Sequence, residues 1–329
     1  MRFLKPAKTS RGEYASKTSW LVFLTENQIT GMGEASPLPD LSIDGEADIE
    51  SVLNRVRHLM NENTPFSEIS ELMKGFPSVR FALESAWLDL KNGGTGVLFP
   101  TSFTGGKTGI PINGLVWMNS VEEMLVEAYA KIKAGFRCIK FKVGALNPDS
   151  ELRMLETIRQ KHNAFSLEIR LDANGAWGTD DAQKLLREFS RYDIHSIEQP
   201  IKKGQLDAMA EVCAKSSIPI ALDEELIGVD ENDFYTVLKK IQPAYIVLKP
   251  SLLGGFGVCD QWIKTSQKLN VGWWATSALE GNVGLSAIAQ WVAGHCPNIA
   301  QGLGTGLLFE NNFTSQTQIL KNEIYYVVK

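Results

Sequence analysis

Two lysines alternate within a short apolar stretch, 138–143, and their spacing indicates acid–base chemistry. Lys140 and Lys142 stand two positions apart, with apolar residues between and beside them. In a β-strand such positions point to the same side and lie roughly 6.6 Å apart. Two ammonium groups at that distance repel by roughly 2.5 kcal/mol at an effective dielectric of about 20, which favours loss of one proton. The pair therefore indicates a site that needs a neutral amine or, as the alternative, a solvated sheet edge protected by lysines.

Further charged residues follow Lys142 at regular spacing. Four strand-like stretches end in a charged residue, and these residues are Asp172, Glu198, Asp223 and Lys249. One such group per strand–helix repeat brings all five to the same rim of a parallel barrel. Three convergent carboxylates repel one another without a cation, and an all-oxygen ligand set suits Mg²⁺, with Mn²⁺ as the alternative. Taken singly, each acid could instead cap a helix or pair with a nearby lysine.

The two outer lysines of this series predict a reaction. In a closed barrel the strands that carry Lys142 and Lys249 lie on opposite sides, so their amines face each other across the acidic residues. A divalent cation there could hold a substrate carboxylate and stabilise the charge formed when the adjacent carbon loses its proton. We therefore expect proton abstraction next to a carboxylate, with a lysine as the base.

The elements that must position these residues follow a strict rhythm. Strand-like runs alternate with amphipathic helical stretches, and the runs lie at 112–117, 138–143, 168–172, 195–198, 219–223, 245–249, 272–276 and 300–304. Eight such units over about 200 residues favour a parallel α/β barrel of the TIM type rather than an open sheet. We predict this barrel over residues 106–307.

The first hundred residues have a different, α+β texture. A strand-like run at 19–24 is followed by helical patterns at 46–61 and 79–91. The C-terminal run 324–328 also looks like a strand, and we expect it to return to the N-terminal region. This predicts a capping domain over residues 1–105, completed by the tail 308–329.

Composition excludes several classes of function. The 329-residue chain has a net charge of −5, which argues against a nucleic-acid partner. No apolar run approaches the roughly 18 residues of a membrane span, and four scattered cysteines without a CxxC motif are typical of reduced thiols. We expect a cytoplasmic protein that acts on a small-molecule carboxylate without membrane insertion; the sequence does not indicate its oligomeric state.

These residues resemble those of the enolase superfamily, in its muconate-lactonizing-enzyme-like branch, which joins an α+β capping domain to a (β/α)7β barrel. Within it, the sequence looks like the o-succinylbenzoate synthase family of menaquinone biosynthesis. The segments that carry this likeness are 113–118, 171–177, 220–224, 274–280 and 302–306. The resemblance implies Mg²⁺-dependent syn dehydration of 2-succinyl-6-hydroxy-2,4-cyclohexadiene-1-carboxylate to 2-succinylbenzoate through an enediolate.

The resemblance also implies roles for the matching residues. Lys142 would be the base and then the acid, Lys249 would stay cationic beside the ring, and Lys140 would tune Lys142. The metal ligands would be Asp172, Glu198 and Asp223. Expected substrate contacts are Ser277, Gly304 and Thr305. The lid would comprise loops 9–12 and 36–44.

Two other functions stay open. A dipeptide epimerase or N-acylamino-acid racemase would use the same two lysines as a pair of bases. Dipeptide epimerases of this superfamily commonly carry Asp-x-Asp near the eighth strand, whereas segment 302–306 has no acid and offers backbone N–H groups to an anionic carboxylate. A barrel that keeps the metal and only binds a ligand is the remaining alternative.

Overall fold

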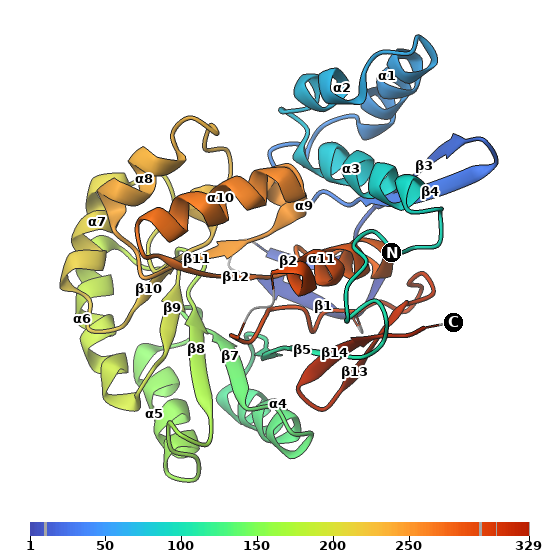
Figure 1. The fold of residues 1–329 in the computed structure, drawn as a ribbon. Coiled ribbons are helices and arrows are strands. Elements are labelled where there is room, and N and C mark those ends of the chain that lie inside the picture. The colour runs from blue at the N-terminus through green and yellow to red at the C-terminus, as the bar shows by residue number, and fades with distance from the viewer. Residues whose placement is uncertain (10–11, 296–297, 307, 329) are drawn as a thin grey trace.

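A ring of parallel strands forms the centre of the molecule (Figure 1). The computed structural model describes residues 1–9, 12–295, 298–306 and 308–328. Seven parallel strands pair in chain order: β6 (Gly114–Val116), β7 (Cys138–Lys142), β8 (Glu168–Asp172), β9 (Ser196–Glu198), β10 (Ile220–Leu222), β11 (Tyr245–Leu248) and β12 (Gly272–Ala275). The predicted TIM-like barrel is therefore confirmed, since consecutive parallel strands with helical crossovers curl into one sheet.

The eighth barrel strand is shorter than the sequence predicts. In place of a strand over 300–304, Gln301 pairs in parallel with Ile112, and Gly302 pairs in parallel with Thr276. Glycine is required at this position, because a Cβ on Gly302 would lie 2.2 Å from the Thr276 Oγ1 atom. The Gln301 side chain also accepts a hydrogen bond from the Ala275 backbone at 2.7 Å. These contacts join the two edges of the seven-stranded sheet and close the ring.

Helices connect the barrel strands and cover the outside of the sheet (Figure 1). They are α4 (Val121–Lys133), α5 (Pro148–Arg159), α6 (Thr179–Phe189), α7 (Leu206–Lys215), α8 (Phe234–Ile241), α9 (Pro250–Leu253), α10 (Phe256–Lys268) and α11 (Asn282–Gly294). The local sequence determines where a helix begins, as α4 shows. Ser120 accepts a hydrogen bond from the backbone of Glu123 at the start of α4. Within the described ranges, no helix is long and apolar enough to span a membrane.

The N-terminal part consists of antiparallel strands and a helical layer. Strand β1 (Arg2–Thr9) pairs with β2 (Gly12–Ser16), and β3 (Trp20–Glu26) pairs with β4 (Ile29–Ala35). The helices are α1 (Ile49–Asn61), α2 (Phe66–Leu72) and α3 (Pro77–Lys91). A Cβ on Gly33 would lie 1.9 Å from the Ala82 carbonyl oxygen, so glycine lets α3 pack directly on β4.

The C-terminal strand does not join the N-terminal sheets, contrary to the expectation from its sequence. Strand β14 (Glu323–Tyr326) forms a hairpin with β13 (Thr317–Leu320) and pairs with β5 (Ile110–Pro111), just before the barrel begins. Ile324 is buried by this pairing, which explains the preference for β5. The N-terminal strand is instead reached by Phe309, which forms an antiparallel bridge with Phe3.

Buried apolar side chains form one large core between the barrel sheet and its helices, and a separate core beneath α1–α3. A third, smaller cluster lies between the N-terminal part and the barrel loops, and comprises Phe3, Leu38, Ile227, Leu252, Ala278, Leu279 and Phe309. In the barrel floor, Arg170 is fully buried and forms an ion pair with Glu168 at 2.7 Å.

Candidate active site

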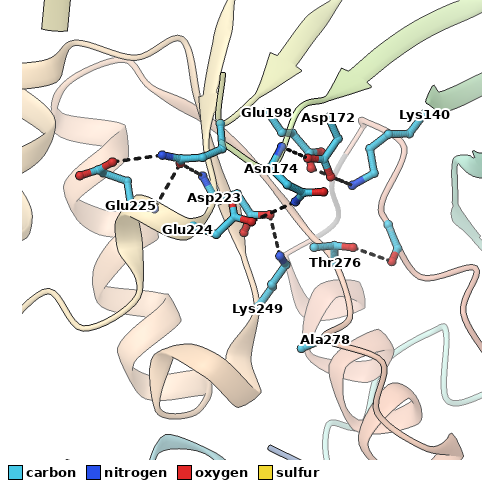
Figure 2. Close-up of polar contacts among 12 residues, drawn as sticks. Lys140, Asp172, Asn174, Glu198, Asp223, Glu224, Glu225, Lys249, Thr276 and Ala278 are labelled. Atoms are coloured by element: carbon cyan, nitrogen blue, oxygen red, sulfur yellow. Dashed lines mark hydrogen bonds and ion pairs between the residues drawn. The ribbon is translucent and has the colours of Figure 1, made fainter. Parts of the chain in front are cut away.

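The charged residues singled out in the sequence lie at one end of the barrel sheet. Lys142, Asp172 and Glu198 are the last residues of β7, β8 and β9, and the pairing register places them side by side. Asp223 directly follows β10, and Lys249 directly follows β11. Parallel strands of a barrel present their carboxyl ends on the same rim, so these five side chains gather there. Figure 2 shows four of them, Asp172, Glu198, Asp223 and Lys249.

The three carboxylates form a compact buried cluster. One oxygen from each of Asp172, Glu198 and Asp223 lies within 4.8 Å of the other two, and the residues are 1%, 0% and 2% exposed. Glu198 Oε1 and Asp223 Oδ1 have no hydrogen-bond partner among the described residues. Buried carboxylate oxygens without donors are unfavourable, and an oxygen-only set is the ligand type of a hard divalent cation. The cluster therefore fits a divalent metal.

Three lysines contact these acids. Lys140 Nζ lies 2.7 Å from Glu198 Oε2 and 3.4 Å from Asp172 Oδ2, while Lys142 Nζ lies 2.5 Å from Asp172 Oδ2. On the opposite side of the cluster, Lys249 Nζ lies 2.6 Å from Asp223 Oδ2. The paired lysines of β7 thus face into the site, and the alternative of a solvated sheet edge is wrong.

Burial and neighbouring charges shift the pKa values in opposite directions. Burial is the largest influence on Lys140 and lowers its pKa, but Glu198 and Asp172 raise it above the ordinary value. Burial likewise raises the pKa of Asp172, but Lys142 and Lys140 hold it well below its usual range. Burial, supported by Asp172 and Asp223, raises the pKa of Glu198 despite Lys140. Asp172 is therefore more firmly ionised than Glu198.

Lys249 has its own set of influences. Burial lowers its pKa, but Asp223 and Glu224 together raise it above the ordinary value for lysine. An ammonium stabilised in this way keeps its proton at neutral pH. Lys249 is thus suited to remain a cation during turnover.

Asn174 was not singled out as a site residue in the sequence analysis. Its Oδ1 accepts a hydrogen bond from Lys142 Nζ at 2.7 Å, and its Nδ2 donates to Glu224 Oε1 at 2.9 Å (Figure 2). Asn174 has a φ of 45°, a left-handed conformation that asparagine tolerates better than most residues. Its position two residues after Asp172, in the loop that follows a barrel strand, is the signal that could have identified it.

A cavity of about 90 Å³, partly open to solvent, lies next to the acid cluster and is lined by Asp172. Both Lys142 and Lys249 line it. The predicted substrate contacts Ser277, Gly304 and Thr305 also line the cavity, and the hydroxyl groups of Ser277 and Thr305 hydrogen-bond to each other. These positions place polar groups in the same cavity wall as Lys142 and Asp172.

The N-terminal part closes the cavity on another side. Leu38 and Leu41, from the predicted lid loop 36–44, line it together with Tyr14. Tyr14 donates a hydrogen bond to the Pro39 carbonyl oxygen at 3.1 Å, which links β2 to this loop. Of the other predicted lid loop, 9–12, residues 10 and 11 lie outside the described ranges.

Comparisons with known proteins agree with this geometry. Residues 123–318 match the family described as "Enolase C-terminal domain-like". An o-succinylbenzoate synthase of Desulfotalea psychrophila is 42% identical, over 96% of this chain and 94% of that protein. The crystal structure of MenC from Desulfotalea psychrophila superposes with a TM-score of 0.83 at 39% identity, covering 94% of each chain. The structure of the L-Ala-D/L-Glu epimerase of Bacillus subtilis shares the fold, with a TM-score of 0.85 at 22% identity over 99% of this chain and 93% of that one.

Proposed function

The chain belongs to the enolase C-terminal domain-like family, and within it to the o-succinylbenzoate synthases, so that it is a carbon–oxygen lyase; from this premise we propose its reaction. The substrate is 2-succinyl-6-hydroxy-2,4-cyclohexadiene-1-carboxylate, and syn loss of water gives 2-succinylbenzoate. One observation supports this most strongly. Lys142 and Lys249 line the same cavity from β7 and from the end of β11, with three buried carboxylates between them.

The carboxylates Asp172, Glu198 and Asp223 are the groups that would hold Mg²⁺. Their buried oxygens include two without donors, which a cation would satisfy. When bound, Mg²⁺ offsets the negative charge that develops on the substrate carboxylate. Three protein ligands leave coordination positions for the oxygens of a substrate.

Lys142 carries the proton in this proposal. As a neutral amine, its Nζ accepts the proton from the carbon next to the ring carboxylate. The resulting ammonium then donates that proton to the hydroxyl group as the C–O bond breaks on the same face, so that water leaves and the ring becomes aromatic. Asn174 holds Nζ by a hydrogen bond of 2.7 Å, which fixes its direction during both transfers.

The other two lysines remain cations in this scheme. Lys249 keeps its charge because Asp223 and Glu224 raise its pKa, and its ammonium can stabilise the electron-rich ring by a cation–π contact. Lys140 is held between Glu198 and Asp172, where it keeps these acids in position. It lies on the same strand face as Lys142, the position from which it would tune that amine.

Racemisation of N-acylamino acids, or epimerisation of dipeptides, is the second candidate. It is favoured by the two lysines on opposite sides of the cavity, the arrangement that a two-base reaction needs. The wall segment that includes Gly304 and Thr305 has no acidic residue to bind the ammonium group of a dipeptide. This leaves N-acylated amino acids as the more suitable substrates of the two.

A spectrophotometric assay of the cyclohexadiene substrate tests the proposal. We expect turnover with Mg²⁺, its loss with EDTA, and its loss in the Lys142→Ala variant. The matched control is Lys215→Ala, which removes an exposed lysine paired with Glu211, and it should keep full activity. Absence of turnover by folded, Mg²⁺-loaded wild type would refute the synthase assignment. Exchange of the α-proton of N-acylamino acids in D₂O would then test the second candidate.

A further inference from the structure

Lys17 is a buried lysine outside the catalytic cluster. It is 6% exposed and lies between β2 and β3, in the N-terminal part of the chain. Its Nζ donates a hydrogen bond of 3.0 Å to the Ser36 carbonyl oxygen and one of 2.9 Å to the Leu279 carbonyl oxygen. Ser36 begins the loop that carries Leu38 and Leu41, whereas Leu279 belongs to the loop after β12. One ammonium therefore joins two loops that both line the cavity.

The loop after β12 needs such support. Leu279 has a φ of 62°, a left-handed conformation that is unfavourable for a leucine and persists only when the surroundings impose it. Its neighbours Ser277 and Ala278 line the cavity with it, and Figure 2 shows Ala278 and Thr276 near Lys249. A change in this backbone would therefore move the wall of the cavity.

Two buried carboxylates complete the network around Lys17. Glu280 accepts hydrogen bonds from the hydroxyl group of Ser251 and from the Ala278 backbone, the latter at 2.8 Å. Ser251 is only two positions from Lys249, so this contact ties the loop to the end of β11. Both Glu280 and Ser251 are 1% exposed or less. Burial lowers the pKa of Lys17 to about 8, although Glu280 and Glu34 raise it, so the ammonium depends on these partners for its charge.

Glu34 anchors the far end of the same loop. Its two oxygens accept hydrogen bonds from the backbone of Gly281 at 2.7 Å and of Gly284 at 2.9 Å, at the start of α11. The positive end of this 13-residue helix stabilises the carboxylate. A Cβ on Gly281 would lie 2.9 Å from Glu34 Oε1, so glycine allows this approach. The loop 276–281 is thus held at its apex by Lys17 and at its end by Glu34.

We propose that Lys17 is a positioning residue for substrate binding, which fixes the loop 276–281 against the loop that begins at Ser36 and so sets the shape of the cavity wall. The kinetic part of this inference rests on the proposed function. Lys17 is not among the residues that line the cavity, whereas Lys142 and Lys249 are. Substrate binding should therefore suffer more than the chemical step.

The test compares wild type with Lys17→Met, which keeps the length of the side chain and removes its charge. Hydrogen exchange of the full Mg²⁺-loaded chain, read by mass spectrometry, should be at least tenfold faster over residues 276–284 and unchanged in β7. The KM for the cyclohexadiene substrate, and the Kd for 2-succinylbenzoate by calorimetry, should rise about tenfold, while kcat falls by less than about threefold. Lys91→Met, which removes an exposed lysine paired with Glu26, is the control and should change none of these.

If Lys17→Met does not fold, Glu280→Gln tests the same network, and we expect the same local increase in exchange and the same weaker binding. Unchanged exchange over 276–284 would overturn the proposal, as would a uniform increase throughout the chain. Faster local exchange with an unchanged Kd would overturn the positioning role. The exchange readout does not depend on catalysis, so an inactive wild type would refute the proposed function without deciding the role of Lys17.

Discussion

Replacing Lys140 by methionine tests how the acid cluster is stabilised. This lysine is 6% exposed, and its Nζ lies 2.7 Å from Glu198 and 3.4 Å from Asp172. At an effective dielectric of about 20, these two attractions amount to roughly 6 and roughly 5 kcal/mol, before the cost of dehydrating the ammonium is subtracted. Removing one partner from such a buried pair is expected to cost about 3–5 kcal/mol of unfolding free energy.

The cost should depend on pH and on metal. Without Lys140, the pKa of Glu198 in the folded state should rise further. When the folded-state pKa of an acid lies above its unfolded-state pKa, the free energy of unfolding of the protein decreases as the pH rises toward the folded-state pKa. The destabilisation should therefore be larger at about pH 8 than at about pH 6. Mg²⁺ should reverse part of the loss, because a cation on the same carboxylates replaces the missing charge and binds only the folded state.

Urea unfolding measures these effects directly. The wild type and Lys140→Met are compared at both pH values, in EDTA and in saturating MgCl₂, with NaCl to match the ionic strength. Lys215→Met is the control, because its ammonium forms an exposed pair with Glu211 and should contribute about 0.5 kcal/mol or less. The reasoning is refuted if the loss equals that of the control, or if it is the same with EDTA and with MgCl₂.

Three further predictions concern the surroundings of the site. Asn174→Ala removes the hydrogen-bond acceptor that directs Lys142, so kcat should fall about 10²-fold while the affinity for Mg²⁺ changes little. Steady-state kinetics and calorimetry measure the two quantities, and an unchanged kcat would contradict this prediction. Glu84→Ala leaves the backbone N–H groups of Phe256 and Gly257 without their acceptor and should cost about 2 kcal/mol in urea unfolding, whereas Glu84→Gln should cost less. The pKa of Glu198 is raised to about 8, and a carboxylic acid must lose its proton before it can bind a metal ion, so the affinity for Mg²⁺ should increase up to about pH 8 and binding should release a proton. Calorimetry in two buffers measures both quantities, and an affinity that does not change with pH would contradict this prediction.

The rim of charged residues could be predicted because local rules decide it. Alternation along β7 places Lys140 and Lys142 on one side, and barrel topology brings the ends of successive strands together. The first step follows from strand geometry and the second from the general topology of a parallel barrel, so neither requires knowledge of particular side-chain contacts. For the same reason β8 covers the same residues, 168–172, as the strand predicted from the sequence.

Other features depend on contacts between distant parts of the chain, which no local pattern records. Lys17 looks like an ordinary surface lysine in the sequence, and only the packing of the N-terminal part on the barrel buries it. The role of Asn174 depends on where its side chain points from a left-handed residue. The partner of β14 could not be predicted either, because several exposed strand edges compete for a terminal strand and side-chain burial decides between them.

The pairing of Gln301 with Ile112, and of Phe309 with Phe3, affects how the chain can be made in the cell. During synthesis on the ribosome, β6 and β12 remain open sheet edges until residues near 301 have emerged. Open edges of this kind can pair with other chains and lead to aggregation. Contacts between such distant residues also slow folding, because the intervening chain must be ordered first. We therefore expect the barrel to complete its folding only after nearly the whole chain has been released, so that truncations near the C-terminus impair solubility more than their small size suggests.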